Sequence, residues 1–365
     1  MSSREARPGS ARHTGAQNRT RSPRPGERPG SGRAPSARRA PGATSGRGAD
    51  GAARRDVVVV GPVPPMARAA GILLVLSGLT GAVAPFLPYL VVGGRRITVA
   101  GGLGTLLVAW VIPVAALAVG AVLVRGRVPK LGLAYAAVGG ALAVGRLLIV
   151  LYRGRTSTAR PAVEVIAGQR VLTSSVEVRA GWVLGVIALS LAVLAGCCAA
   201  VAWGRTVMED SGGLDRFRGS LAGAAVMLGV LTVLCLVLPA ADMPEHLVTD
   251  PSTGMETVVT QEGPQALLDR PGLALLGGLL LAGAVVLCSV VAPSLRPRLA
   301  TVGGLLALAV TVLAAALEGL RDAVVSPDLQ WTVPGAGLLV AGAGYALLTV
   351  LAWRLRAGAP EPVRS

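Results

Sequence analysis

Eight apolar segments, each about twenty residues long, recur along the chain from residue 67 onward. They extend over residues 67–88, 101–124, 131–152, 181–203, 220–240, 272–292, 300–320 and 333–353. A helix needs roughly 20 residues to cross a hydrocarbon layer of about 30 Å. In lipid, a run of this length can satisfy its own backbone hydrogen bonds only as a helix. The pattern therefore predicts an all-α integral membrane protein with about eight transmembrane helices.

The composition favours lipid over water as the surroundings of these segments. Of the 365 residues, 52% are hydrophobic and only 15% are charged. A soluble domain carries about 25% charged residues, so the shortage of charge excludes an ordinary soluble domain of this length. Lys130 is the only lysine, whereas arginine, alanine and glycine are abundant. Such usage favours a GC-rich bacterial genome, and an actinobacterial genome is the favoured interpretation.

Residues 1–60 form a segment rich in Arg, Pro, Gly and Ser, with few side chains that could build a core. We predict a disordered cytoplasmic tail. One interpretation is a basic arm that contacts anionic lipid headgroups, worth about 1 kcal/mol per arginine near the surface; the favoured one is a solvated tail with no specific role. A third is that translation starts at Met66. The net charge of +16 lies largely here, without interleaved aromatic residues, so we expect no nucleic-acid partner.

The distribution of basic residues predicts that both termini lie in the cytoplasm and that the protein spans a bacterial plasma membrane. Arg125, Arg127 and Lys130 fill one short connection, and Arg296 and Arg298 fill another. Short basic connections favour the cytoplasmic side. The connection over residues 241–270 is acidic and is expected outside. An exception is the arginine-rich connection after the third apolar segment, which the same topology also places outside.

An internal duplication divides the membrane part into two four-helix repeats, expected at residues 66–210 and 216–356, followed by a short cytoplasmic tail at 357–365. Residues 127–131 match residues 295–299, and the same offset pairs Arg153 with Arg321. The fourth and eighth segments also match, with Trp203 opposite Trp353. Because four is even, both repeats enter the membrane from the same side, so they form parallel repeats about an axis normal to it.

Several connections on the predicted outer side carry β-prone runs. Residues 89–92 and 96–99 flank Gly93 and Gly94, a pattern typical of a two-residue hairpin turn. Further β-prone runs lie at residues 246–249, 255–260, 163–166 and 176–179. We predict small β-hairpin elements in the extracytoplasmic loops, joined into a small sheet over each bundle, because an isolated hairpin is marginally stable.

The chain shows no catalytic or cofactor signature, so we expect no enzyme activity, no cofactor and no metal site. Its histidines are His13 and His246. Asp242, Glu245 and His246 could meet around a metal ion, but a solvated charge cluster is the favoured interpretation. Cys197, Cys198, Cys235 and Cys288 all fall in apolar runs and are interpreted as small buried hydrophobic residues.

Two ionisable residues lie within the predicted spans, Arg146 in the third and Glu318 in the seventh. Charges at such depth are costly and mark functional candidates. In the repeat alignment Glu318 matches Val150, one turn beyond Arg146 on the same face. We therefore predict a candidate intramembrane polar pair that fastens the two repeats or lines a polar path. The alternative is that both side chains reach into the headgroup region near the outer surface.

The sequence favours a non-enzymatic membrane or envelope component that acts through protein partners and the lipid bilayer. The alternative is a small-molecule transporter built from the parallel repeats. A cluster of Arg146, Glu318, Arg153 and Arg321 around a central cavity would favour transport, whereas a centre filled with alanine and leucine would favour the partner-acting component.

Overall fold

The computed structural model describes residues 59–92, 95–98, 102–154, 163–166, 169–172, 176–209, 217–242, 246–249, 256–259, 272–325 and 330–355. Most of the predicted basic tail, the short tail at 357–365, His13 and Glu245 lie outside these residues. The end of the 1–60 segment is more structured than predicted, because Val59–Val60 form strand β1, paired with β7 (Met208–Glu209).

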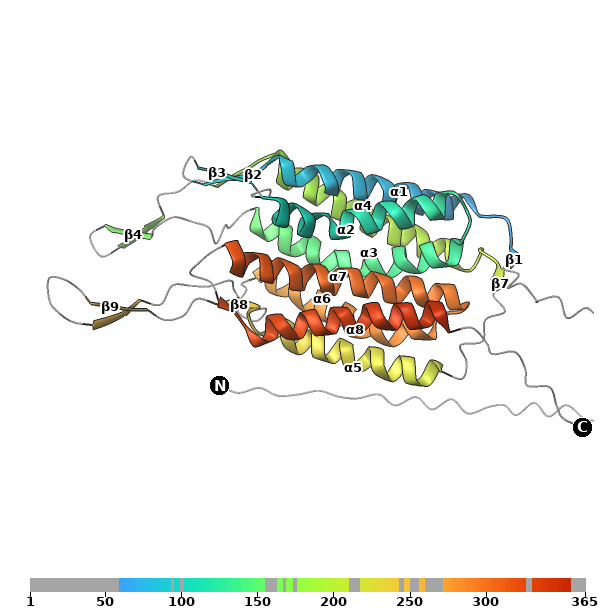
Figure 1. Cartoon of the computed structure of the whole chain (residues 1–365). Coiled ribbons are helices and arrows are strands. Elements are labelled where there is room, and N and C mark those ends of the chain that lie inside the picture. Colours follow the sequence, from blue (N-terminus) through green and yellow to red (C-terminus); the bar gives the residue numbers. More distant parts are fainter. Residues whose placement is uncertain are drawn as a thin grey trace, which may run out of the picture. The chain divides into compact units, whose positions relative to one another are not determined.

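Eight long helices form most of the described chain (Figure 1). They are α1 (Pro65–Val83), α2 (Leu103–Val124), α3 (Pro129–Arg153), α4 (Ala180–Trp203), α5 (Arg218–Val237), α6 (Gly272–Ser294), α7 (Arg298–Val325) and α8 (Val333–Arg354). Each is long and apolar enough to cross a membrane. The prediction of eight such helices is therefore confirmed, and the chain is compatible with a multi-pass membrane protein.

Prolines and charged residues explain where several helices begin and end. Pro65 and Pro129 occupy first-turn positions, where the missing N–H is not needed. Helix α1 ends at Val83, earlier than predicted, because a 3-10 turn (Ala84–Phe86) containing Pro85 follows it. Helix α7 continues beyond the predicted residue 320, since charged residues end an apolar run without interrupting a helical backbone.

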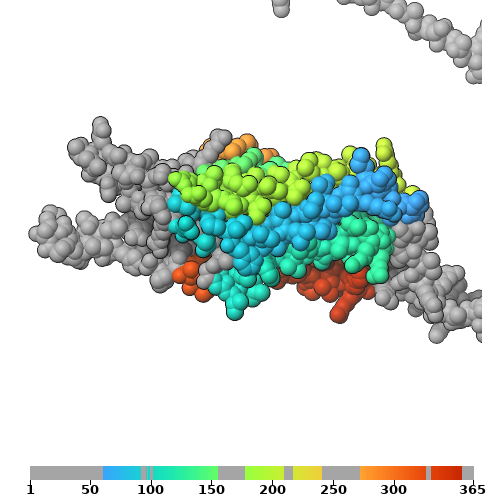
Figure 2. All heavy atoms as spheres, turned by 90° about the horizontal axis from the view of Figure 1, so that it is seen from above, coloured from blue at the N-terminus to red at the C-terminus, as the bar shows by residue number. Residues whose placement is uncertain are grey.

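Helices α3 and α7 occupy the middle of the bundle and are the most buried of the eight. Helix α3 packs against α4, α6 and α7, and α7 packs against α8, α3 and α2. The other six helices expose large apolar side chains: Leu76, Leu107, Leu194, Met227, Leu287 and Leu347. Figure 2 shows α1, α2 and α4 side by side on one such face. This exposed apolar surface fits contact with lipid.

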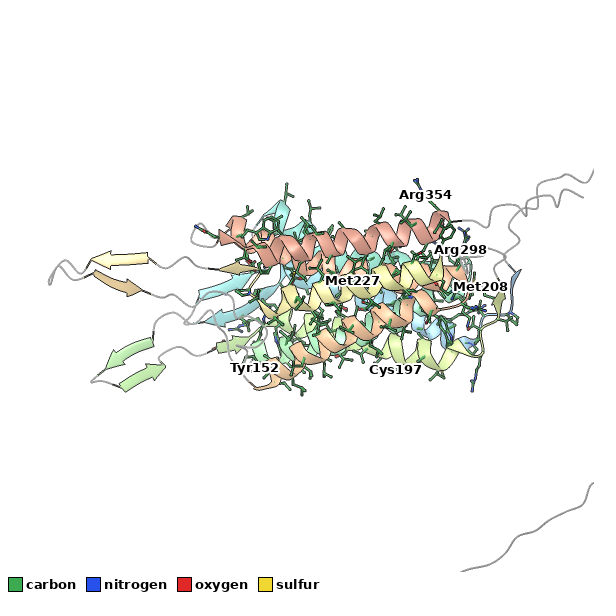
Figure 3. The ribbon with its side chains drawn as sticks, turned by 90° about the horizontal axis from the view of Figure 1, so that it is seen from below. Tyr152, Cys197, Met208, Met227, Arg298 and Arg354 are labelled. Atoms are coloured by element: carbon green, nitrogen blue, oxygen red, sulfur yellow. The ribbon has the colours of Figure 1, made fainter. Side chains whose placement is uncertain are left out.

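One cysteine assignment was wrong. Cys235 and Cys288 are buried and Cys198 is half-buried, as small hydrophobic residues would be, but Cys197 is exposed on the outside of α4 (Figure 3). An apolar neighbourhood in the sequence does not distinguish the protein interior from lipid, because both surroundings are apolar.

Strands connect the helix ends at one end of the bundle, called here the strand end. Strands β2 (Pro88–Val92), β3 (Arg95–Thr98) and β6 (Val176–Val178) form an antiparallel sheet in the order β3-β2-β6. Strand β8 (Ala241–Asp242) pairs with β11 (Gln330–Trp331), and both contact α7. Residue Val92 lies opposite Arg95 in the register of β2 and β3.

Four further strands form two separate antiparallel pairs. Strand β4 (Val163–Ile166) pairs with β5 (Gln169–Leu172), and β9 (His246–Thr249) pairs with β10 (Glu256–Val259). The sequence analysis missed β5. Among the described residues, β4 bonds to β5 and does not join the β3-β2-β6 sheet.

The opposite end of the bundle, called here the turn end, carries the short connections between α2 and α3 and between α6 and α7. Basic residues gather at this end: Arg68, Arg125, Arg127, Lys130, Arg205, Arg218, Arg296, Arg298 and Arg354. Figure 3 shows Arg298 and Arg354 at this end and Tyr152 at the other. Among acidic residues whose side chains the structure describes, Glu177, Glu318 and Asp322 all belong to the strand half.

Glycines lie where the neighbouring helices α4 and α6 approach α3 closely. A Cβ atom on Gly140 would lie 2.8 Å from the Cα atom of Gly196 on α4, and one on Gly145 would lie 2.5 Å from the carbonyl oxygen of Gly277 on α6. Between apolar helices in lipid, small residues allow the backbone packing that drives association. The α3–α6 contact therefore depends on the absence of a side chain at Gly145.

We expect Gly145→Val to lower the free energy of unfolding by about 2 kcal/mol, because the added side chain forces α3 and α6 apart. Thermal unfolding of the purified chain in detergent measures the change. Gly283→Val is the matched control, since Gly283 lies on the exposed face of α6 and a Cβ atom added there would have nothing within 4 Å. Equal melting temperatures for the two variants would contradict the close α3–α6 approach.

Candidate functional site

The structure brings Arg146 of α3 and Glu318 of α7 together. Nη2 of Arg146 donates a hydrogen bond to Oε1 of Glu318 over 3.1 Å, and the side chains are 25% and 44% exposed. Each residue lies seven positions before the last residue of its helix, roughly 10 Å from the strand end at 1.5 Å per residue. The pair therefore lies inside the bundle, about two turns from the strand end of each helix, and both side chains are partly exposed.

Further charged groups surround the pair toward the strand end. Arg153 ends α3, and Asp322 lies one turn beyond Glu318 on α7. Arg321 donates two hydrogen bonds to Oδ1 of Asp322, from Nε over 2.9 Å and from Nη2 over 2.6 Å. Three arginines and two carboxylates thus occupy the same end of the α3 and α7 pair.

Tyr89 of β2 lies beside this charged group. Burial raises the pKa of Tyr89 above its ordinary value; the positive charge of Arg153 partly opposes the rise, and the negative charge of Glu318 adds to it. The phenol therefore remains protonated at any physiological pH. Its hydroxyl group can donate a hydrogen bond next to the pair.

Two cavities meet at Arg146. The first, called here the α1–α4 cavity, has a volume of about 240 Å³ and lies among α1, α2, α3 and α4 with a contribution from α7. The second, called here the interface cavity, measures about 230 Å³ and is bounded by α3, α5, α6, α7 and α8. Arg146, Val150 and Thr311 line both cavities.

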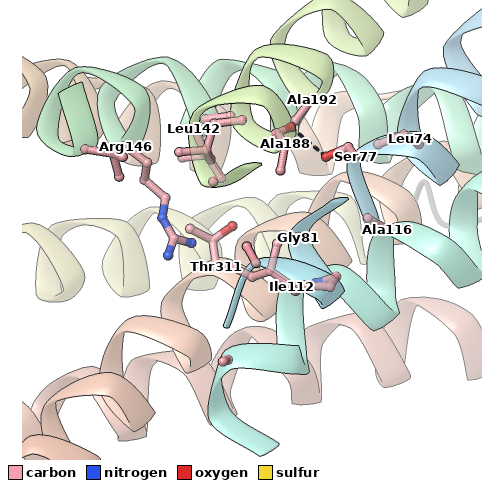
Figure 4. Close-up of a pocket in the computed structure, with 18 of the residues that line it drawn as sticks. Leu74, Ser77, Gly81, Ile112, Ala116, Leu142, Arg146, Ala188, Ala192 and Thr311 are labelled. Carbon is pink, nitrogen blue, oxygen red and sulfur yellow. Dashed lines mark hydrogen bonds between the residues drawn. The ribbon is translucent and has the colours of Figure 1, made fainter. Parts of the chain in front are cut away.

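The two cavities differ in chemistry. Leu74, Ile112, Leu142 and Leu189 give the α1–α4 cavity an apolar wall, to which Arg146 and Tyr89 add polar groups. Figure 4 shows Arg146 extending toward Thr311 on one side of this cavity, away from the Ser77 hydroxyl, which donates to the carbonyl oxygen of Ala188 over 2.7 Å. The interface cavity is more charged, because it is lined by Arg146, Arg153, Glu318 and Asp322.

Toward the turn end, α3 and α7 have an apolar, filled interior. Leu133, Leu305 and Leu308 are almost fully buried. A Cβ atom on Gly303 would collide with the backbone of Leu131, so the two helices touch closely there. Near the strand end, Arg146, Arg153 and Glu318 line a cavity that Arg321 does not line, whereas apolar side chains fill the interior toward the turn end.

The sequence analysis named Arg146, Glu318, Arg153 and Arg321 but missed Tyr89, Thr311 and Asp322. Arg321 does not line either cavity and instead holds Asp322. Asp322 was recognisable as an acidic residue next to Arg321. Nothing in the sequence distinguishes Tyr89 or Thr311 from the other polar residues of these segments, because their position depends on how the elements pack.

The sequence analysis also missed a buried polar contact within the last four helices. The hydroxyl groups of Ser289 on α6 and Tyr345 on α8 lie 2.6 Å apart, and Tyr345 donates to the carbonyl oxygen of Ala225 on α5 over 3.2 Å. The two hydroxyl groups and the Ala225 carbonyl group are thus hydrogen-bonded to one another, and this contact links α5, α6 and α8.

No group of three His, Cys, Asp or Glu residues that could hold a metal ion occurs in the described part of the chain. The predicted cluster of Asp242, Glu245 and His246 is not tested by this, since Glu245 lies outside that part. No protein-family model matches the chain, and comparison with curated proteins and with solved structures finds no match.

A double-mutant cycle measures the Arg146–Glu318 interaction. We expect Arg146→Leu and Glu318→Leu each to destabilise the chain, because each leaves one charge without its partner, and the double variant to recover about 1 kcal/mol of the sum. The estimate is small because both side chains are partly exposed. Thermal unfolding of the four proteins in one detergent gives the coupling; additive effects would show that the two side chains do not interact.

Proposed function

We propose that the chain is a small-molecule transporter of a bacterial plasma membrane, built from two parallel four-helix repeats and non-enzymatic. The observation that carries this proposal is the meeting of two cavities at Arg146, in the contact between the two central helices. A binding site between repeats is the usual arrangement of transporters built in this way.

The packing of the helices supports the proposed repeats. Within the first four helices, α1 packs against α2 and α4, and α3 packs against α4; within the last four, α5 packs against α6 and α8, and α7 packs against α8. Between the groups, the α3–α6 contact has its counterpart in α7–α2, and α3–α7 is its own counterpart. A twofold axis through the α3–α7 contact would produce this pattern.

Two basic residues at the turn end make equivalent contacts. Nζ of Lys130, at the start of α3, donates to the carbonyl oxygen of Trp203 over 2.6 Å and lies 4.2 Å from the centre of the Trp203 ring. Nη1 of Arg298, at the start of α7, donates to the carbonyl oxygens of Leu355 over 3.1 Å and Trp353 over 3.5 Å. Each cation binds carbonyl groups at the end of the partner helix, where the helix dipole is negative.

If the repeats are equivalent, Lys130→Met and Arg298→Met should destabilise the chain by similar amounts, about 1 to 3 kcal/mol each, because each removes a buried donor from the carbonyl groups at the end of the partner helix. Lys130→Arg and Arg298→Lys should restore most of the stability. Arg127→Met, in the exposed turn before α3, serves as the control. Loss of stability at only one of the two positions would contradict their equivalence.

The distribution of charge supports a cytoplasmic turn end. Basic side chains gather in and beside its short connections, and the positive-inside tendency counts the Lys and Arg residues of short connections. Both termini would then be cytoplasmic, and the basic N-terminal segment would lie next to anionic lipid headgroups. The strands β2, β3, β6, β8 and β11 would face the outside.

Transport requires a second state. In the structure the charged group lies near the strand end, and the tightly packed contact of α3 with α7 separates it from the turn end. A rocking motion of the two repeats about the proposed axis would open the turn end and close the strand end. The Arg146–Glu318 pair joins the two moving parts and would form in one state and loosen in the other.

A cysteine at Ala315, which lines the interface cavity, tests this proposal. In a variant whose four native cysteines are replaced by alanine, we expect a membrane-impermeant maleimide to label Ala315→Cys from the strand side in right-side-out vesicles, and from the turn side in inside-out vesicles at a rate about tenfold slower. Arg96→Cys and Arg127→Cys in the same background report the strand side and the turn side.

Labelling of Ala315→Cys from the strand side alone would contradict transport. It would favour the second candidate, an envelope component that acts through protein partners. The observation in favour of this candidate is the strand end itself, where pairing of β2 with β6 and of β8 with β11 ties the connections of the helices to one another. Such an ordered surface is suited to contact with another protein.

A further inference from the structure

We infer that the α1–α4 cavity binds a medium-chain carboxylate, with the carboxylate at Arg146 and the acyl chain along the apolar wall. This inference rests on the proposed function, since it names the class of molecule that the site would take. It follows from the lining of the cavity, the hydrogen-bond donors at one side of it and the local balance of charge.

The wall of the cavity selects an apolar chain. A volume of about 240 Å³ corresponds to roughly eight groups of the size of water at about 30 Å³ each. Leu74, Ile112, Leu142 and Leu189 offer water no hydrogen bonds, and the hydroxyl group of Ser77 is already bonded to Ala188. This apolar wall therefore favours contact with an apolar chain over contact with water.

One side of the same cavity selects an anion. Within the described residues Arg146 makes one hydrogen bond, to Glu318, so four of the five N–H groups of its guanidinium are left for other acceptors. The planar guanidinium fits a carboxylate with two parallel hydrogen bonds. Tyr89 also lines this cavity, and its protonated hydroxyl is a further donor.

The charges near the pair favour a single negative charge on the ligand. Among the described side chains, Arg146, Arg153 and Arg321 lie with Glu318 and Asp322, which leaves one positive charge. A monocarboxylate neutralises it. A phosphate monoester, with nearly two negative charges, would overcompensate and would be repelled by Glu318 more strongly than a monocarboxylate.

The open space at Gly185 has no counterpart at the matched position of the last four helices. Gly185 on α4 lines the cavity and a Cβ atom there would meet open space, whereas its counterpart in the repeat alignment, Gly335 on α8, lies against Trp331 and the carbonyl oxygen of Ala240, 2.5 Å from an added Cβ. Open space at only one of two matched positions shows that the cavity does not arise from the four-helix packing alone.

The ligand would also act on the contact between the repeats. A carboxylate at Arg146 competes with Glu318 for the same guanidinium, because both are planar acceptors of its N–H groups. Binding would therefore weaken the link between α3 and α7. In the proposed transporter this competition couples occupation of the site to the movement of the repeats.

Equilibrium binding of radiolabelled octanoate to the full chain in lipid nanodiscs tests the inference. We expect saturable binding above that of empty nanodiscs, with octanol and octylamine, which carry the same chain without the anion, competing at least about tenfold more weakly. Arg146→Gln should weaken octanoate binding at least about tenfold, and Arg146→Lys should restore part of it.

A cavity-filling variant provides a second arm. Gly139 of α3 lines the cavity and has nothing within 4 Å of an added Cβ, so Gly139→Leu should fold and exclude the acyl chain, lowering affinity at least about tenfold. Gly185→Leu replaces it should Gly139→Leu fold poorly. Gly283→Leu on the exposed face of α6 is the control and should bind as the unmodified chain does.

Absence of saturable octanoate binding, or equal binding by Gly139→Leu and Gly283→Leu, would overturn the inference. The failure of the inference and the failure of the proposed function give different results. Two-sided labelling of Ala315→Cys without octanoate binding leaves a transporter with another substrate. Octanoate binding with labelling from the strand side alone leaves a carboxylate-binding membrane protein that does not transport.

Discussion

The architecture depends on one constraint, that backbone N–H and C=O groups in lipid must find partners within their own segment. A helix meets this requirement residue by residue, so a run of about twenty apolar residues has one stable form. The constraint is relaxed where helices end. For that reason the prolines, the basic side chains, the paired strands and most hydrogen bonds between distant segments gather at the two ends of the bundle.

The same constraint explains how much of the fold was predictable. Helices were recognisable because length and hydropathy determine them, whereas boundaries moved where a proline or a charged turn intervened, as after Val83 and beyond residue 320. The faces of the helices were not predictable, because lipid is as apolar as the interior of the bundle. Cys197 and Cys288 have similar apolar neighbours in the sequence, yet one faces outward and the other is buried.

The candidate site was predictable only in its charged part. Arg146 and Glu318 stand out because ionisable groups are rare and costly in spanning helices. Tyr89 of β2 and Thr311 of α7 line the same cavity as Arg146 through packing that no local pattern encodes. The cavity itself was hidden, since it results from missing side chains at Gly139 and Gly185, two of 49 glycines in the chain.

In the proposed twofold arrangement, a charged pair close to the axis cannot consist of two residues at matched positions. Two arginines at matched positions would repel each other, as would two glutamates, so one repeat must supply the cation and the other the anion. In the proposed alignment, Ala314 stands opposite Arg146 and Val150 opposite Glu318. Arg146 lines both cavities, whereas Glu318 lines only the interface cavity. In the proposed arrangement, the α1–α4 cavity therefore has the arginine without the glutamate in its wall, which makes it the better suited of the two to a carboxylate.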